Sequence, residues 1–285
     1  MLTKRFRHIF VSVFLLTTFV CSAAAQSGID HLKLGDAAFE AKNYDLAIAE
    51  YTKGLKADPN NATAYYNRGL ANYNKRNYDA AITDLSRSIE INPNDADAYY
   101  QRGRSYYLRI EALRAFDNMS AMLDAAISDY TKAIQIKTDY ADPYSGRAQA
   151  HLVKGNFDQA IIDYSKAIEI DPKFPSDYNN RGLAYNEKQN FDAAIADYTK
   201  AIQIDPNFTD AYNNRGRAYY NKGSYDKAIG DYTYVIRVKE TRSSAYLDRA
   251  NAYCKIGKTA LAKADYDRAI QLQPMFATII PRLCK

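Results

Sequence analysis

A repeat of 34 residues runs through most of this chain and constrains its fold more than any other feature. The stretch 177–206 recurs from residue 210 with most of its residues unchanged. Weaker copies begin at residues 28, 62, 96, 141 and 243. Repetition at this spacing predicts a tandem array of similar units, each packed on its neighbours, in place of one central core.

Alignment of the copies gives seven units: 28–61, 62–95, 96–140, 141–174, 175–208, 209–242 and 243–276. Six have 34 residues, and the third has 45. In the fifth unit, Tyr178, Gly182 and Tyr185 fall on one face of a helix. A second apolar stripe follows: Ala194, Ile195, Tyr198, Ala201 and Ile202. Each unit is therefore predicted to form two amphipathic helices joined by a short turn.

Polar and proline residues mark the two ends of each second helix. The expected N-cap residues are Asn43, Asn77, Asn156, Asn190 and Ser224. An Asp two residues later suits the positive end of the helix dipole in each of these units. Helix ends are expected at Pro59, Pro93, Pro172, Pro206 and Pro274, because proline cannot continue the hydrogen-bond ladder.

Small residues recur at fixed places in both helices. In the first helix they are Gly35, Gly69, Gly103, Ala148, Gly182, Gly216 and Ala250. In the second helix they are Ala47, Ala81, Ala126, Ala160, Ala194, Ala228 and Ala262. With the neighbouring aromatics and the closing proline, this pattern resembles the tetratricopeptide repeat over residues 28–276. The resemblance implies an all-α fold, a right-handed superhelical solenoid of helix-turn-helix units. The departures are Gly54, Ser88 and Val235 for a later Ala, and Thr138 and Glu240 for the Pro.

The glycines inside the first helices need an explanation, since each costs roughly 1 kcal/mol relative to alanine. Close approach of the two helices of a unit is the gain we expect. A phosphate-binding role would need a glycine-rich loop before a helix N-terminus, and one glycine per helix interior does not provide it.

Arg and Asp recur together in six units. The Arg residues are Arg68, Arg102, Arg147, Arg181, Arg215 and Arg249, and the Asp residues are Asp84, Asp129, Asp163, Asp197, Asp231 and Asp265. The first unit has Leu34 and Glu50 instead, so the two residues are lost together. We predict a bidentate ion pair that locks the helical pair or its neighbour. A ladder of anion-binding arginines is the alternative.

Residues 1–25 have the pattern of a secretory signal peptide. Lys4, Arg5 and Arg7 form a basic head, 9–20 an apolar run, and 23–25 a small-residue exit. The run is short for a membrane span, so an uncleaved anchor is the weaker interpretation, and no stable membrane insertion is expected. Before Cys21, Thr18-Phe19-Val20 lacks the small residue of a lipoprotein site. An exported location, periplasmic or secreted, is therefore predicted.

The charge of the chain gives no indication of nucleic-acid binding. Without the three basic residues of the N-terminal segment, 35 Lys and Arg stand against 33 Asp and Glu, and the net charge falls from +5 to about +2. No basic run or patch is evident.

Two cysteines remain beyond the N-terminal segment, Cys254 and Cys284. An exported location permits a disulfide between them, and the segment 275–285 is expected to fold back over the last helical pair. Two free thiols are the alternative.

The third unit carries eleven extra residues between Leu108 and Leu123. Eleven residues are about three helical turns, which would lengthen both helices if shared between them. The turn is expected near Asp117 and Asn118. Apolar residues of this hairpin tip are Leu113, Phe116, Met119 and Met122. They either form an exposed contact site or zip the two longer helices together.

No motif for catalysis, a metal or a cofactor is present, so we do not expect an enzyme. His31 and His151 are the only histidines beyond the N-terminal segment, and both occupy places expected to face the core. The carboxylates follow the repeat as caps, ion pairs and solvated faces.

The resemblance implies that the first helices line a concave groove, which holds a peptide or a partner protein. Helical spacing selects the side chains expected to face inward. They are Tyr66, Leu70, Tyr73, Tyr100, Arg104, Tyr107, Gln149, Leu152, Asn179, Leu183, Asn186, Asn213, Arg217 and Tyr220. Tyrosine supplies stacking area, and asparagine supplies adaptable hydrogen bonds. An exported scaffold for a cell-envelope complex is the leading prediction.

Two alternatives from other classes stay open. A homo-oligomer is possible, because a terminal helical pair without a polar outer face can pack on a second copy. A protein that binds glycans or the cell wall is the other alternative, since tyrosine-rich grooves also suit sugars.

Overall fold

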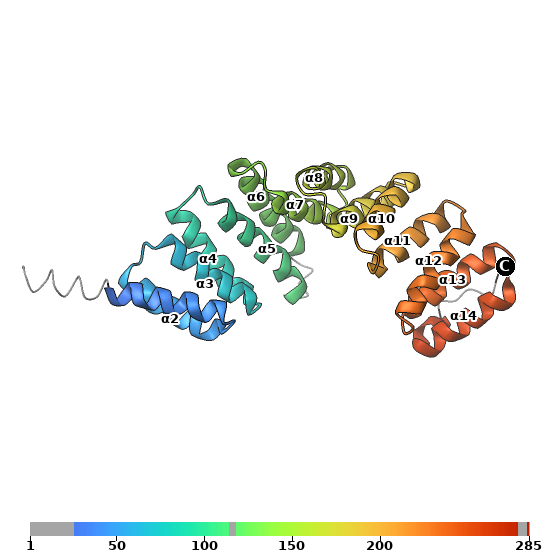
Figure 1. Ribbon diagram of the computed structural model, residues 1–285, viewed down its shortest axis with the longest axis horizontal. Coiled ribbons are helices and arrows are strands. Elements are labelled where there is room, and N and C mark those ends of the chain that lie inside the picture. The colour runs from blue at the N-terminus through green and yellow to red at the C-terminus, as the bar shows by residue number, and fades with distance from the viewer. Residues whose placement is uncertain (1–25, 114–117, 279–283, 285) are drawn as a thin grey trace, which may run out of the picture. The chain divides into compact units, whose positions relative to one another are not determined.

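The computed structural model describes residues 26–113, 118–278 and 284 (Figure 1). Within these residues the chain is helical and contains no strand. Two compact units divide it, Met1–Thr138 and Asp139–Lys285. Both consist of antiparallel helical pairs in tandem, so the prediction of an all-α tetratricopeptide-type solenoid is confirmed.

In the first unit, a helix over residues 26–40 precedes α2. The following helices are α2 (Tyr44–Ala57), α3 (Ala62–Asn74), α4 (Tyr78–Ile91), α5 (Ala96–Leu113) and α6 (Met119–Ile136). α3 packs on α4 and α5 on α6 as hairpins, while α2 packs on α3 and α4 on α5 between hairpins. Each hairpin thus buries its two faces against its own partner helix and against the next hairpin.

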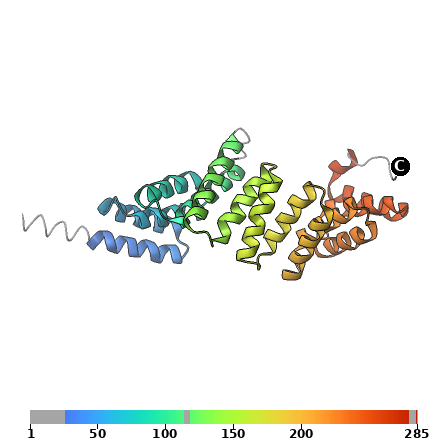
Figure 2. The ribbon, with the colours of Figure 1, turned by 90° about the horizontal axis from the view of Figure 1, so that it is seen from above.

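The second unit repeats this arrangement four times (Figure 2). Its elements are α7 (Ala141–Val153), α8 (Phe157–Ile170), α9 (Pro175–Glu187), α10 (Phe191–Ile204), α11 (Thr209–Asn221), α12 (Tyr225–Val238), α13 (Ser243–Lys255), α14 (Thr259–Leu272) and the 3₁₀ helix η2 (Pro274–Thr278). η2 packs on α14.

The helix ends follow the register of the repeat more closely than they follow individual residues. Asn43 and Asn190 accept N–H bonds of 3.2 and 3.3 Å from Leu46 and Ala193. The other three expected caps, Asn77, Asn156 and Ser224, stand at the N-cap position without a side-chain bond to the helix. α6 and α12 end at the same register as the rest although no proline follows them there.

A tyrosine of the second helix explains most of the first-helix glycines. An added Cβ at Gly182 would lie 2.8 Å from the ring of Tyr198, and one at Gly216 would lie 2.8 Å from the ring of Tyr232. At Gly69 the neighbour is Leu85, 2.9 Å away. These rings and side chains are almost fully buried, so the glycines allow the close helical approach that we predicted.

The predicted Arg–Asp pairs are confirmed, and all six are bidentate. The pairs are Arg68–Asp84, Arg102–Asp129, Arg147–Asp163, Arg181–Asp197, Arg215–Asp231 and Arg249–Asp265. Five of these arginines also donate to a hydroxyl on the preceding second helix, at Thr52, Ser86, Ser165, Thr199 and Thr233. Each such arginine therefore links its own hairpin to the previous one.

The eleven extra residues of the third repeat lengthen both of its helices. α5 and α6 have 18 residues each, compared with 13 and 14 in α3 and α4. Met122 is only 7% exposed, so for this residue the second alternative holds: it packs in the stem and is not part of an exposed contact site. Met119 is half-buried. Phe116 and the side chain of Leu113 lie outside the described residues.

Candidate functional site

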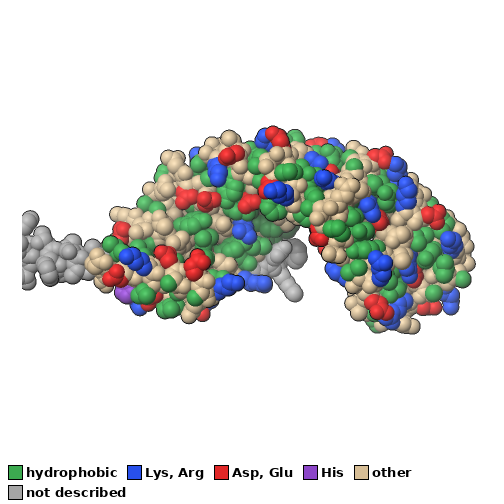
Figure 3. All heavy atoms as spheres, in the orientation of Figure 1, with side chains coloured by type: hydrophobic (Ala, Val, Ile, Leu, Met, Phe, Trp, Pro, Cys, Tyr) green, Lys and Arg blue, Asp and Glu red, His purple; other side chains and the backbone are tan. Residues whose placement is uncertain are grey.

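We call the side of each unit formed by the predicted groove residues the first-helix surface. It is built by α3 and α5 in the first unit, and by α7, α9, α11 and α13 in the second. On the face drawn in Figure 3, basic and acidic side chains alternate with apolar ones. That face therefore carries no field of one sign.

In the first unit, tyrosines enclose Arg104. Its guanidinium carbon lies 4.8 Å from the ring centre of Tyr73 and 5.4 Å from that of Tyr100. Tyr100 in turn lies 6.0 Å from the buried ring of Tyr130. Arg104 donates a hydrogen bond to Oε1 of Gln101 at 3.2 Å. The rings hold the arginine by cation–π contacts.

The tyrosines of this cluster keep their phenol protons. Burial raises the pKa of Tyr66 to about 12, and the charges of Asp97 and Asp95 act in the same direction. Burial also raises the pKa of Tyr73, although the nearby Arg104 opposes the shift. Both hydroxyls can therefore donate hydrogen bonds to an incoming carbonyl or carboxylate.

The second unit presents amides in place of these rings. Asn179 is 6% exposed, accepts from Nδ2 of Asn214 at 2.9 Å and donates to Oδ1 of Asn180 at 3.1 Å. Asn179, predicted to face the groove, is thus buried and links α9 to α11. Gln149 and Arg217 are exposed.

The remaining predicted residues lie partly covered along the same surface. Leu70, Tyr107, Leu152, Leu183 and Tyr220 are half-buried. The ring of Tyr220 packs edge-on against Tyr225, with 5.4 Å between centres.

Three buried polar atoms of this surface have no hydrogen-bond partner among the described residues. They are Oδ1 of Asn186, the hydroxyl of Tyr198 and Oδ1 of Asn213. Arg217 lies 3.8 Å from Glu187, and both side chains are about half exposed. Buried polar groups in native proteins are nearly always bonded, so these three atoms distinguish this part of the surface.

Asp248 of α13 adds an unusual carboxyl group beside them. Burial raises its pKa to about 6, and the positive charges of Arg217 and Arg242 reduce the shift. The sequence analysis missed Asp248 and Tyr198, because it looked only for residues pointing away from the packing stripe. The signal for Asp248 was available: it is a carboxylate where α9 and α11 carry Asn180 and Asn214.

The first repeat replaces the Arg–Asp pair with a different network. Glu50 bonds to Nδ1 of His31 at 2.6 Å and to Nζ of Lys53 at 2.6 Å. The His31 side chain is 31% exposed and hydrogen-bonds to Glu50, so its predicted place facing the core is wrong. Its lysine and histidine partners lower the pKa of Glu50.

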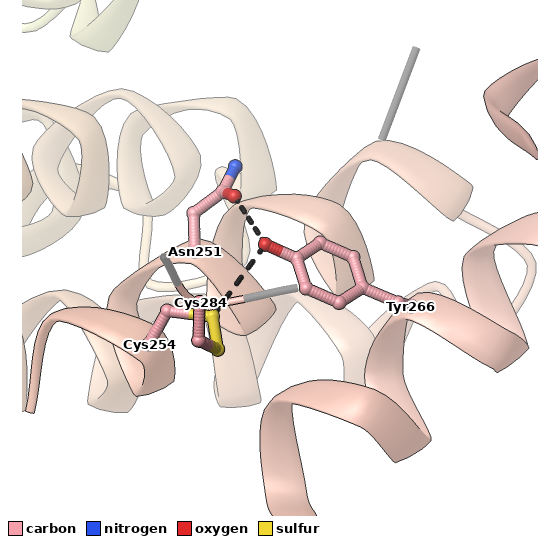
Figure 4. Close-up of a disulfide and its surroundings, with 4 residues drawn as sticks. All are labelled: Asn251, Cys254, Tyr266 and Cys284. Carbon is pink, nitrogen blue, oxygen red and sulfur yellow. Dashed lines mark hydrogen bonds between the residues drawn. A yellow bond between two sulfur atoms is a disulfide. The ribbon is translucent and has the colours of Figure 1, made fainter. Parts of the chain in front are cut away.

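Cys254 and Cys284 form a disulfide (Figure 4). Cys284 packs on Ala250, Ala262 and Tyr266 of the last hairpin. Cys254 occupies the first-helix position that Tyr220 holds one repeat earlier. Cys284 therefore covers part of the first-helix surface of the last repeat, while residues 279–283 lie outside the described residues.

Within the described residues, no cluster of three His, Cys, Asp or Glu side chains could hold a metal ion. In the same part of the chain, no helix has the length and apolar character needed to cross a membrane.

Stacked helical hairpins in tandem define an α-helical repeat protein. Tetratricopeptide repeat models match residues 32–96, 152–189, 182–223, 209–241 and 243–274. The chain belongs to the tetratricopeptide repeat family. A sequence search of curated proteins found no match.

Several solved structures resemble this chain. MamA is 30% identical with a TM-score of 0.57, and the match covers 64% of this chain and 93% of MamA. The C-terminal part of a TPR repeat-containing protein from Cytophaga hutchinsonii is 21% identical with a TM-score of 0.68, covering 85% and 95%. YrrB is 20% identical with a TM-score of 0.56, covering 69% and 98%. At these last two identities the likeness concerns the fold alone.

Proposed function

We propose that this protein is an exported scaffold of seven tetratricopeptide units. It binds a peptide or protein partner on its first-helix surface and supports assembly of a cell-envelope complex. The observation that carries the proposal is the Arg104 cluster. The arginines of the six Arg–Asp pairs each bind an Asp. Arg104 instead lies on tyrosine rings, with no carboxylate within ion-pair distance among the described side chains. Its donors, beside tyrosine hydroxyls, suit the carbonyl and carboxylate oxygens of a peptide.

A structure of the same fold supports binding of a peptide. YrrB is described as a TPR protein with an unusual peptide-binding site. Because its identity to this chain is low, it supports the kind of ligand and not the residues that bind it.

Two features support export. Residues 1–25 combine a basic head, an apolar run and a small-residue exit. The Cys254–Cys284 disulfide is of a kind that persists in oxidising compartments and is rare in the cytosol.

Selection from a random peptide library on the immobilised full chain tests the binding function. Peptides should be enriched, and Arg104→Ala combined with Tyr107→Ala should weaken their binding by about tenfold or more, because stacking area and charged donors are lost. Ile162→Ala is the control, since Ile162 is 65% exposed on α8, away from the first helices. Binding that survives the double variant, or no enrichment at all, would overturn the proposal.

Export is tested separately. Residues 1–25 fused to a reporter that is active only outside the cytosol should make it active, and replacing Lys4, Arg5 and Arg7 with Glu should reduce that activity. Retention of the full fusion inside the cell would count against an exported scaffold.

Self-association is a second candidate function, favoured by one observation. Leu34 and Leu46 of the first repeat are 54% and 46% exposed, and with Ala37 and Ala41 they line an apolar hollow of about 340 Å³. Leu34→Arg installs the residue that the other six repeats carry at this place. The measured mass in solution should then fall from dimer to monomer if this surface joins two copies.

A further inference from the structure

Neighbouring first helices are joined by a side-chain hydrogen bond at one repeated place. In the first unit, Nδ2 of Asn67 on α3 donates to Oδ1 of Asp36 on the preceding first helix at 3.1 Å. In the second unit, Nδ2 of Asn214 on α11 donates to Oδ1 of Asn179 on α9 at 2.9 Å. Asp248 of α13 occupies the same place one repeat later. A carboxylate thus replaces the hydrogen-bond donor of this place.

The replacement leaves two acceptors without a donor. Asn213 of α11 is the equivalent of Asn179, and its Oδ1 has no partner among the described residues. The carboxylate of Asp248 likewise makes no hydrogen bond or ion pair with a described residue. An ionised carboxylate only accepts, so it cannot supply the N–H group that Asn214 supplies one repeat earlier.

Asp248 is accessible, unlike the Asp residues of the Arg–Asp pairs. It is half-buried and lies in the middle of α13, on the first-helix surface. Asp231 of the adjacent α12, by comparison, is 7% exposed and accepts from Arg215. A group from outside the protein can therefore reach the carboxylate of Asp248 without displacing a bonded side chain.

The two arginines that face Asp248 are each engaged by another acid. Burial raises the pKa of Asp248, and the charges of Arg217 and Arg242 oppose that shift. Arg217 lies 3.8 Å from Glu187, and Arg242 donates to Asp210 at 2.7 Å. Three carboxylates against two guanidinium groups give this cluster a net charge of −1 when Asp248 is ionised.

The phenols on the other two adjacent helices bring no charge to the cluster. On α12, burial and the charge of Asp248 raise the pKa of Tyr232. On α14, burial raises the pKa of Tyr266, whose hydroxyl donates to Asn251, one turn after Asp248. Both phenols are therefore neutral at neutral pH, and the negative charge of the cluster stays uncompensated.

We propose that Asp248 binds the ammonium or guanidinium group of a Lys or Arg side chain in the bound peptide. The inference rests on the proposed function, whose partner chemistry it specifies at the second unit. A basic side chain supplies both the N–H donors and the positive charge that this place lacks. Hydrogen bonds from such a group to a carboxylate are charge-assisted, and therefore stronger than those between neutral groups.

Other ligand groups fit this place less well. A carboxylate would meet a charge of its own sign. An apolar side chain would cover Asp248 and leave it without a donor. A neutral amide would donate a hydrogen bond but would leave the negative charge uncompensated, and the experiment below separates it from a basic group.

The experiment uses the peptides enriched on the full chain in the library selection. These peptides should share a Lys or Arg at one position. Changing that residue to Gln, which keeps N–H donors and removes the charge, should weaken binding by about tenfold. The Asp248→Asn protein should bind the original peptide about tenfold more weakly, and the change to Gln should then have little further effect.

The variants are chosen so that folding is preserved. Asp248→Asn installs the residue that α9 and α11 carry at this place, Asn180 and Asn214. Asp226→Asn is the matched control: Asp226 is exposed on the second helix α12, and the substitution removes the same charge. This control should bind the peptide as tightly as the wild-type chain does.

The pH dependence of binding gives a readout that a merely structural role would not produce. Asp248 binds a cation when it is ionised, and its pKa in the free protein is about 6. For a peptide without His, wild-type affinity should therefore fall several-fold from about pH 7 to about pH 5. The Asp248→Asn protein should lack this fall.

The failure of this inference differs from failure of the proposed function. Peptides that need Arg104 and Tyr107 but bind Asp248→Asn protein as tightly as wild type would overturn the role of Asp248 alone. Equal binding of the Lys and Gln peptides would do the same, and would indicate a neutral donor at this place. If no peptide is enriched, both proposals fall together.

Discussion

At the scale of single residues, the first-helix glycines and the second-helix tyrosines act together, because the missing side chain of each glycine makes room for the residue that faces it. Four tyrosine rings and one leucine press against glycines in the first helices, at Gly35, Gly69, Gly103, Gly182 and Gly216. Ala148 and Ala250 occupy the same place in two repeats, where the facing rings are Tyr164 and Tyr266. Alanine is therefore tolerated after a small shift of the facing ring, and glycine is preferred because it leaves that ring more space.

A pair of glycine substitutions separates fit from helix propensity. Gly230→Ala in α12 should stabilise the protein by about 1 kcal/mol, because nothing lies within 4 Å of the added methyl. Gly182→Ala should be less favourable than Gly230→Ala by about 1 kcal/mol or more, because its methyl meets the Tyr198 ring at 2.8 Å. Urea unfolding measures both, and an equal gain in the two variants would contradict the account of close approach.

Asp248 should make the stability of the second unit depend on pH. Its pKa is raised to about 6 in the folded protein, against about 4 for an ordinary Asp. Between these values the folded protein binds more protons than the unfolded chain, so this group lowers stability as pH rises from about 4 to above 6. Arg217 and Arg242 face it, and Arg242 also bonds to Asp210 at 2.7 Å.

Replacing Asp248 with Asn should remove that pH-dependent loss. We expect Asp248→Asn to be more stable than the wild-type chain by about 1–3 kcal/mol at pH 7, with the difference vanishing near pH 4. The difference in unfolding free energy, measured at several pH values, isolates this group from the other carboxyls. A constant difference across the range would show that Asp248 titrates normally.

The sequence predicted the residues that repeat, and missed those whose role depends on a neighbour in another repeat. Arg181 and Asp197 recur at a fixed spacing, so their pairing could be inferred. The Ser165 hydroxyl accepts a hydrogen bond from Arg181 and completes the link between the hairpins. In the sequence, Ser165 cannot be told from an ordinary surface serine. Likewise Oδ1 of Asn179 accepts from Asn214, whereas Oδ1 of Asn213 has no partner among the described residues, a difference that the sequence did not indicate.

At the scale of elements, register outweighs local signals. The second helices α6 and α12 end where the others do although they lack the following proline, since the packing of each hairpin on the next fixes their length. The same reasoning predicts that the extra residues of the third repeat lengthen both α5 and α6. Two antiparallel helices that must return to the register of the repeat can only lengthen together. The burial of Met122 could not be read from sequence, where stem and tip residues look alike.

The disulfide is the covalent link of the last element to the rest of the chain. It joins residues 30 apart in sequence, and a loop of that length is associated with about 3 kcal/mol of stabilisation. Cys284→Ser should lower the stability of the last hairpin by an amount of this order, measured by thermal unfolding. The double variant Cys254→Ser with Cys284→Ser is the control, and reductant should not change it further.

Gel mobility of the thiol-blocked protein checks the bond itself. Wild-type protein should migrate faster without reductant than with it, while the double variant should not respond. Identical mobility of the wild-type protein under both conditions would mean that the two thiols are free.

At the scale of the whole molecule, one side of every helix packs on neighbouring helices and another side stays free. The second helices contribute the buried tyrosines and the Asp residues of the ladder. The first helices carry the Arg104 cluster in one unit, and Asn186, Asn213 and Arg217 in the other. The sequence predicted this division between the two helices of a hairpin, and the contacts between side chains then distinguished residues that link helices from residues that stay exposed.

Site-specific photo-crosslinking from two positions of one hairpin tests the central claim, that the first-helix surface is where a partner binds. Gln149 in α7 and Ile162 in α8 are both exposed in the fourth repeat, on the first and the second helix. A crosslinking residue at Gln149, in full-length protein within its own host, should capture a defined partner, and one at Ile162 should not. Capture of the same partner from Ile162, or from both positions equally, would contradict the claim.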